Sequence, residues 1–160
     1  MKKLISATVV AAAILFAQTS FAQYKTALGV RLSNSQAMVN NSISLKHFIT
    51  EAAAVEALFS FGDPLAIGAV LQIHKPLSVE GLQWFYGGGG YLGFERVYDP
   101  NTKVNNTETN FGAMGSLGLD YKFANAPLNL SLDWKPELNL FNDITFEPAA
   151  IGLSVRFVFR

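Results

Sequence analysis

Two histidines, His47 and His74, are the residues of this chain most suited to acid–base catalysis. Serine-type hydrolases and acyltransferases need a hydroxyl nucleophile, a histidine and an acidic side chain within hydrogen-bonding reach of one another. Both histidines lie in apolar segments whose side chains alternate between two faces, and they fall on opposite faces. Whether either can act as a base therefore depends on which serine and which acid the fold brings to it.

Other motifs with possible chemistry are weak. The run Gly87–Gly90 lacks the Lys-Ser/Thr of a phosphate-binding loop, and it lies in a predicted strand, where glycines let the chain bend and leave room for Tyr91. Asp99, Glu108 and Asp143 lie on separate predicted loops without the spacing of metal ligands. The chain has no cysteine, which excludes disulfides and a lipid-modified cysteine. We therefore expect no cofactor and no metal.

Charged residues recur singly on the small-residue face of the apolar segments. They are Arg31, Lys46, Glu56, Glu95, Asp120, Lys122, Asp133, Lys135 and Arg156. Five are basic and four are acidic, and such a balance is expected where buried charges must each find a partner. Lys46 and Glu56 lie on neighbouring segments and could be diagonal partners. We expect these residues to form a structural polar network inside the fold.

Eight segments are predicted to be β-strands, because bulky apolar side chains alternate with small or charged ones. They are 26–33, 42–49, 52–61, 65–74, 83–97, 109–123, 128–135 and 150–160. The last is the clearest, and its length suits a tilted strand that crosses a bilayer, which needs about 9–11 residues. A helix competes over Glu51–Leu58, but the parity of Phe59 and Phe61 favours a strand.

The N-terminus and the composition indicate an exported protein. Lys2 and Lys3 precede an apolar run, and Ser20-Phe21-Ala22 has the small residues of a cleavage site, so residues 1–22 are predicted to be a signal peptide. Residues 23–160 then form one domain. The chain is 50% hydrophobic and only 15% charged, whereas soluble domains carry about 25% charged residues. With 12 basic and 12 acidic residues it has no nucleic-acid footprint.

Side-chain size predicts which face of the strands is inside. The interior of an eight-stranded barrel is only just wide enough for side chains. Gly, Ala, Ser and single charges would fit there, whereas eight strands of Leu, Ile, Phe and Trp would overfill it. We therefore predict an all-β, eight-stranded antiparallel up-and-down transmembrane β-barrel with a side-chain-filled lumen and bulky apolar residues facing lipid.

This topology places four loops on the outer side: 34–41, 62–64, 98–108 and 136–148. The turns near 50, 75–82 and 124–127 then face the periplasm, and both histidines lie near that side. An enzyme acting on outer-leaflet lipid would need its histidine at the opposite end. We therefore expect no enzymatic activity, and we expect external or envelope partners at loops 98–108 and 136–148.

Two stretches carry a resemblance to a known family. They are P-L-N-L-S-L-D-W-K-P at Pro127–Pro136 and I-G-L-S-V-R-F-V-F at Ile151–Phe159. The chain resembles the small eight-stranded outer-membrane β-barrel proteins of Gram-negative bacteria, of the OmpX and OmpA-barrel type. The second stretch looks like the signal read by the barrel-assembly machinery, which implies that role for Val155, Phe157 and Phe159.

The resemblance implies an outer-membrane location better than an activity, because that family is functionally mixed. We expect a structural or surface-interaction role with a lumen plugged by paired charges. Three alternatives stay open: a narrow conduit or binder for a small solute, a lipid A-modifying enzyme, and a soluble periplasmic barrel that binds a lipophile.

Overall fold

The structure is a computed structural model that describes residues 25–34, 36–99, 104–141 and 144–159. The predicted signal peptide, residues 1–22, lies outside the described residues. The described residues contain no helix with the length and apolar character of a membrane span.

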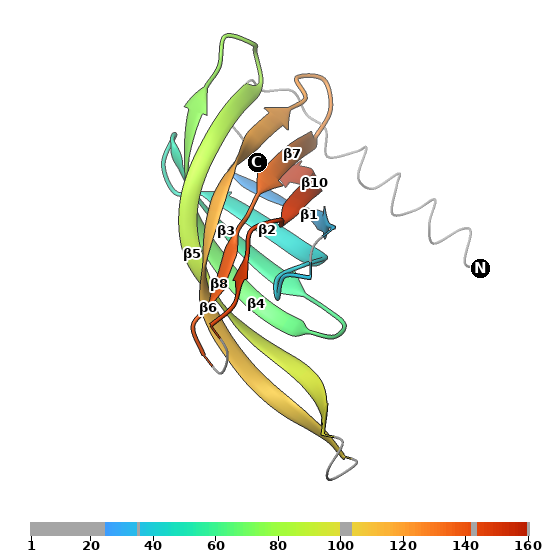
Figure 1. Ribbon diagram of the computed structural model, residues 1–160. Helices are drawn as coiled ribbons and strands as arrows, with labels where there is room; N and C mark the ends of the chain where they lie inside the picture. Colours follow the sequence, from blue (N-terminus) through green and yellow to red (C-terminus); the bar gives the residue numbers. More distant parts are fainter. Residues whose placement is uncertain (1–24, 35, 100–103, 142–143, 160) are drawn as a thin grey trace, which may run out of the picture.

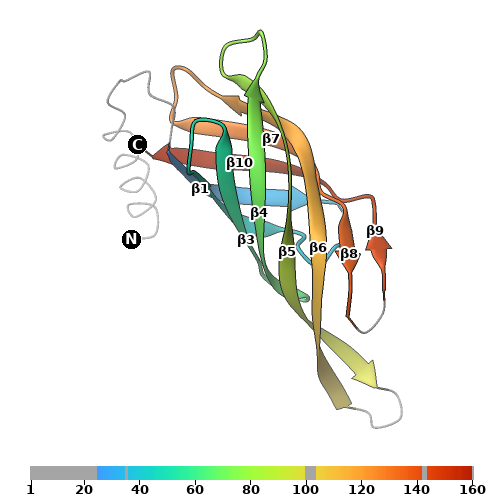
Figure 2. The ribbon, with the colours of Figure 1, turned by 90° about the vertical axis from the view of Figure 1, so that its left-hand side faces the viewer.

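The described residues form a closed antiparallel β-barrel (Figures 1 and 2). Its eight main strands are β1 (Thr26–Ser33), β2 (Ser42–Phe48), β3 (Ala53–Ser60), β4 (Leu65–Pro76), β5 (Leu82–Asp99), β6 (Val104–Lys122), β7 (Leu128–Trp134) and β10 (Ile151–Phe159). Each strand pairs with the next one along the wall, and β10 pairs with β1 to close the barrel. The predicted eight-stranded up-and-down barrel is therefore confirmed.

The alternation of side chains decides the two faces of the wall. Along β10, Leu153 and Val155 are exposed on the outside, whereas Ser154 and Arg156 are buried inside. The same pattern holds on β2, where Ile43 is exposed. Bulky apolar residues therefore face outward and small or charged residues face the lumen, as the side-chain sizes predicted.

Several predicted boundaries are wrong at both ends of the barrel. We call the end that holds the start of β1 the terminal end, and the opposite end the mouth. At the terminal end β4 continues to Pro76 and β5 begins at Leu82, so the predicted 75–82 connection is a turn over residues 77–81. At the mouth β5 and β6 pair as far as Asp99 and Val104, so most of the predicted loop 98–108 is strand.

This β5–β6 hairpin projects past the other strands (Figure 1). Exposed polar residues such as Arg96 and Thr107 occupy both of its strands. A hairpin with solvent on both faces needs no apolar alternation, which is why the sequence pattern did not reveal it.

The predicted loop 136–148 contains a short strand pair, β8 (Glu137–Asn139) and β9 (Phe146–Glu147). β8 pairs with β6 and so extends the wall at the mouth, beside β9 (Figure 2). The break between β7 and β8 falls at Pro136, which has no N–H to donate to a strand ladder. Across this break the Lys135 amide donates to the Ala150 carbonyl at 2.8 Å.

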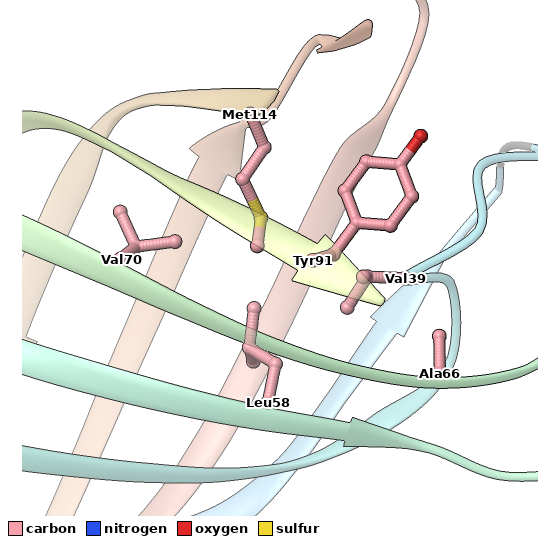
Figure 3. Packing of buried hydrophobic residues seen from close by; sticks show 6 residues of the cluster. All are labelled: Val39, Leu58, Ala66, Val70, Tyr91 and Met114. Carbon is pink, nitrogen blue, oxygen red and sulfur yellow. The ribbon is translucent and has the colours of Figure 1, made fainter. Parts of the chain in front are cut away.

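In the predicted outer loop 34–41, the described residues 36–41 fold into the lumen instead of facing outward. Ala37 and Val39 on this segment are buried. Val39 packs in an apolar cluster at the mouth, where Tyr91 and Met114 also lie (Figure 3). The remaining members of that cluster are Leu58, Ala66 and Val70.

A second buried apolar cluster lies at the terminal end. It consists of Ala27, Phe48, Ala54 and Val158. Buried polar side chains, among them Lys46, Asp120 and Arg156, fill the rest of the lumen.

Candidate functional site in the barrel lumen

The central polar network is organised by Arg156, which reaches from β10 to three other strands. Its Nη2 donates to Oε1 of Glu56, and the two side chains form an ion pair. Its Nε donates to Oγ of Ser44 at 2.6 Å, and its Nη1 donates to Oδ1 of Asn129 at 3.1 Å. All four side chains are buried. A single guanidinium therefore ties together β10, β3, β2 and β7.

Glu56 is the main acceptor of this network. Its Oε1 also accepts a hydrogen bond from Ser44 Oγ at 2.5 Å, and its Oε2 accepts one from Gln72 Nε2 at 2.6 Å. Each carboxylate oxygen thus has at least one donor. A buried carboxylate is stable only where hydrogen bonds and an opposite charge replace its water, and Glu56 has both.

Asp120 connects the second cation to the same network. Lys46 Nζ lies 3.0 Å from Asp120 Oδ1, and Asn129 Nδ2 donates to Asp120 Oδ2 at 2.7 Å. The ammonium of Lys46 also lies 4.5 Å from the ring centroid of Phe85, within cation–π range. The central network therefore holds two cations and two carboxylates, supplied by β2, β3, β6 and β10.

The predicted pairing of Lys46 with Glu56 is wrong, because each of them forms its ion pair with another residue. The two residues are opposite each other in the β2–β3 register, yet the ion pair of Lys46 is with Asp120 and that of Glu56 is with Arg156. A long lysine side chain reaches across a narrow lumen as easily as to the next strand. Which charged residues pair is therefore decided by which strands face each other across the lumen.

A second polar group lies nearer the mouth and contains Arg31 and Asp133. The Arg31 guanidinium binds the Asp133 carboxylate in a forked arrangement, with Nε at 3.0 and 3.1 Å and Nη2 at 2.6 Å. Gly152 makes this position possible, because a Cβ there would overlap the guanidinium of Arg31. The forked geometry fixes the orientation of both side chains as well as their distance.

Lys135 and Glu137 hold the inward-folded segment in place. Lys135 Nζ pairs with Glu137 and donates to the Val39 carbonyl at 3.1 Å. Glu137 Oε2 in turn accepts a hydrogen bond from the Val39 amide at 3.3 Å. The pair therefore satisfies both backbone groups of a residue that is buried away from any strand.

The nine residues predicted for the lumen do not all lie together. Seven are buried there: Arg31, Lys46, Glu56, Asp120, Asp133, Lys135 and Arg156. Glu95 and Lys122 share the lumen-facing parity of Tyr91 and Asp120 but are only half-buried, Glu95 at the mouth and Lys122 at the terminal end. Glu137 was missed because it lies in a segment without periodicity. Its proximity to Lys135 was the only available signal.

Neither histidine contacts a serine hydroxyl in the described residues. His74 is buried between the rings of Phe48 and Phe85, and its Nε2 lies 3.3 Å from Gln72 Oε1. His47 is exposed on the outside, where its Nδ1 lies 2.9 Å from Thr26 Oγ1. Val155, Phe157 and Phe159, the predicted assembly-signal residues, lie on the outer face of β10.

The fold matches that of a known barrel domain. The chain is similar to the crystal structure of the N-terminal β-barrel domain of Pseudomonas aeruginosa OprF, with a TM-score of 0.63 and 13% sequence identity over 86% of this chain and 98% of that one. No family model matches the sequence, and no curated protein matches it. At this identity the likeness concerns the fold, and it agrees with the predicted small outer-membrane barrel architecture.

Proposed function

We infer that the protein is an integral outer-membrane β-barrel with a structural or surface-interaction role. One observation carries this inference: the usual distribution of side chains is inverted. Leu32, Ile67 and Leu132 are 59%, 55% and 52% exposed on the outer face, whereas the arginines of the lumen are 1% exposed. Such an outer surface would aggregate in water and is stable against lipid hydrocarbon.

In this proposal the terminal end faces the periplasm and the mouth faces outward. Residues 1–22 direct export, and Val155, Phe157 and Phe159 engage the barrel-assembly machinery during insertion. The bilayer is the permanent partner. The surfaces available to an external or envelope partner are the projecting β5–β6 hairpin, which overlaps the predicted contact region 98–108, and the β8–β9 segment, which lies within 136–148.

The lumen supports a plug rather than a conduit. Four cations and four carboxylates are buried in it: Arg31, Lys46, Lys135 and Arg156 with Glu56, Asp120, Asp133 and Glu137. Each charge has an opposite partner across the lumen or beside it. The segment with Val39 adds backbone and apolar side chains at the mouth. A solute would have to separate these pairs in a medium of low dielectric, which costs several kcal/mol per ion.

Labelling with a lipid-phase reagent tests the orientation of the wall. Leu153→Cys and Ser154→Cys are neighbours in β10 on opposite faces. The cysteine at position 153 should react in vesicles with a lipid-soluble maleimide, and the one at 154 should not. Equal reactivity at the two positions, or a mature chain that stays in solution without detergent, would contradict a membrane barrel.

Planar-bilayer recording tests the plug. The refolded chain should produce no steady conductance steps. Regular steps would show that the lumen is a conduit and not a plug. Mass spectra of lipid A from cells with and without the gene should be identical, because neither histidine contacts a serine hydroxyl in the described residues, and His74 is enclosed between the rings of Phe48 and Phe85. A change in acylation would instead favour an enzyme.

A further inference from the structure

A cavity of about 280 Å³ opens at the mouth of the barrel, above the plugged lumen. Its walls come from β5, β6, β8, β9 and the inward-folded segment. Four carboxylates line it, those of Glu95, Glu108, Glu137 and Glu147. Tyr91 forms part of its floor.

The four carboxylates are arranged as two pairs of like charges. Glu95 is directly opposite Glu108 in the β5–β6 register, and Glu137 is directly opposite Glu147 in the β8–β9 register. Like charges directly opposite each other destabilise a strand pair. A sequence selected for stability alone would not place two such pairs around one cavity.

Within the described residues, little positive charge offsets the negative charge of these carboxylates. Glu137 pairs with Lys135, whereas Glu95, Glu108 and Glu147 form no ion pair there. Among the described residues, Glu147 Oε1 accepts a hydrogen bond from the Ala149 amide alone, at 3.0 Å. The cavity therefore has an excess of negative charge that favours a cationic ligand.

Tyr91 provides an independent indication of a ligand. The residue is only 5% exposed, and its ring packs in the apolar cluster with Met114 and Val39. Its hydroxyl points away from that cluster (Figure 3) and has no hydrogen-bond partner in the part of the chain that the structure describes. The hydroxyl oxygen is open to the cavity that Tyr91 lines, so it is available to a molecule bound there.

The spacing of the carboxylates decides which kind of cation fits. No three acidic or histidine side chains among the described residues are close enough together to hold a metal ion. The two pairs lie instead on separate hairpins. A ligand that meets both pairs needs separate positive groups joined by an apolar chain, which could lie over the side chains of Met38 and Tyr91 in the same cavity.

We propose that the mouth cavity binds a protonated aliphatic polyamine. One ammonium group lies between Glu95 and Glu108, and another lies near Glu147, while the Tyr91 hydroxyl accepts a hydrogen bond from an amine. This is a binding activity beyond the structural role, and it would hold whether or not the surface contacts another protein.

Calorimetric titration of the full refolded chain in detergent with spermidine tests the proposal. The wild type should bind, and the Glu95→Gln/Glu108→Gln variant should bind roughly tenfold more weakly, because two charge-assisted hydrogen bonds are lost. The matched control, Glu51→Gln/Glu80→Gln, removes two exposed carboxylates at the terminal end and should bind like the wild type. Tyr91→Phe keeps the ring and should weaken binding severalfold.

Three results would overturn the proposal. They are no spermidine binding at millimolar concentration, equal weakening in the mouth and control variants, and displacement of spermidine by equimolar MgCl2. A heat-modifiable gel shift for each variant shows that it is folded. Since the gel shift and Cys labelling report on the membrane barrel independently, failure of polyamine binding is distinguishable from failure of the proposed outer-membrane role.

Discussion

Two groups of carboxylates in the same barrel are arranged in opposite ways. At the centre, Glu56 and Asp120 each meet a cation from another strand and accept further hydrogen bonds. At the mouth, Glu95 lies opposite Glu108, and no cation of the described residues pairs with either. The centre is therefore arranged to hold the wall together, whereas the mouth keeps charge available at some cost in stability.

Arg156→Met should have the largest effect, because it removes the cation that joins four strands and leaves Glu56 buried without its ion-pair partner. We expect the free energy of unfolding to fall by about 3–5 kcal/mol. Urea unfolding in lipid vesicles, followed by tryptophan fluorescence, measures it. The control is Glu95→Gln at the mouth, which should leave the stability nearly unchanged. Similar losses in the two variants would mean that the centre and the mouth do not differ.

Lys135→Met tests the boundary between the two groups, where one ammonium holds the inward-folded segment. Loss of the ion pair to Glu137 and of the bond to the Val39 carbonyl should cost about 3 kcal/mol. Hydrogen exchange at the Val39 amide should accelerate more than exchange in β10. Lys122→Met, at the terminal end, is the control and should leave Val39 exchange unchanged. Unchanged exchange in Lys135→Met would show that the segment is held by apolar packing alone.

Gly152→Ala tests how tightly Arg31 fits in the wall. The added methyl would overlap the guanidinium, so Arg31 must shift away from Asp133, and we expect a loss of about 1–3 kcal/mol. Gly88→Ala is the matched control on the outer face, where the nearest atom to an added Cβ is the Met114 carbonyl oxygen at 3.6 Å. Equal urea midpoints for the two variants would show that the Arg31 site is adaptable.

The sequence predicted the faces of the wall but could not predict the contacts across it. Alternation along Ile151–Phe159 places Arg156 inside, because side chains of a strand point to alternate faces. It gives no information on which strands face each other across the lumen, so the Lys46–Asp120 pair could not be predicted. That pairing depends on the stagger of the closed barrel.

The mouth was the least predictable region, since its structure depends on tertiary contacts alone. Residues 36–41 are polar enough to suggest a solvated loop, yet Val39 is buried because Lys135 and Glu137 satisfy its backbone. Glu108 and Glu137 lie in segments without apolar periodicity. Their positions opposite Glu95 and Glu147 require the hairpin registers, and only the structure supplies these.

Glu108→Lys should have the smallest effect on stability. It tests the difference between the centre and the mouth directly, because it converts one like-charge pair at the mouth into a pair of opposite charges. The variant should be more stable than the wild type by about 0.2–1 kcal/mol, measured by urea unfolding in vesicles. It should also bind spermidine much more weakly, since a cation now occupies the place proposed for an ammonium group. Glu80→Lys makes the same charge change at the terminal end and should alter neither quantity. A gain in stability together with a loss of binding would show that the like-charge pair is kept for a ligand; destabilisation would show instead that the carboxylate of Glu108 has a structural role at the mouth.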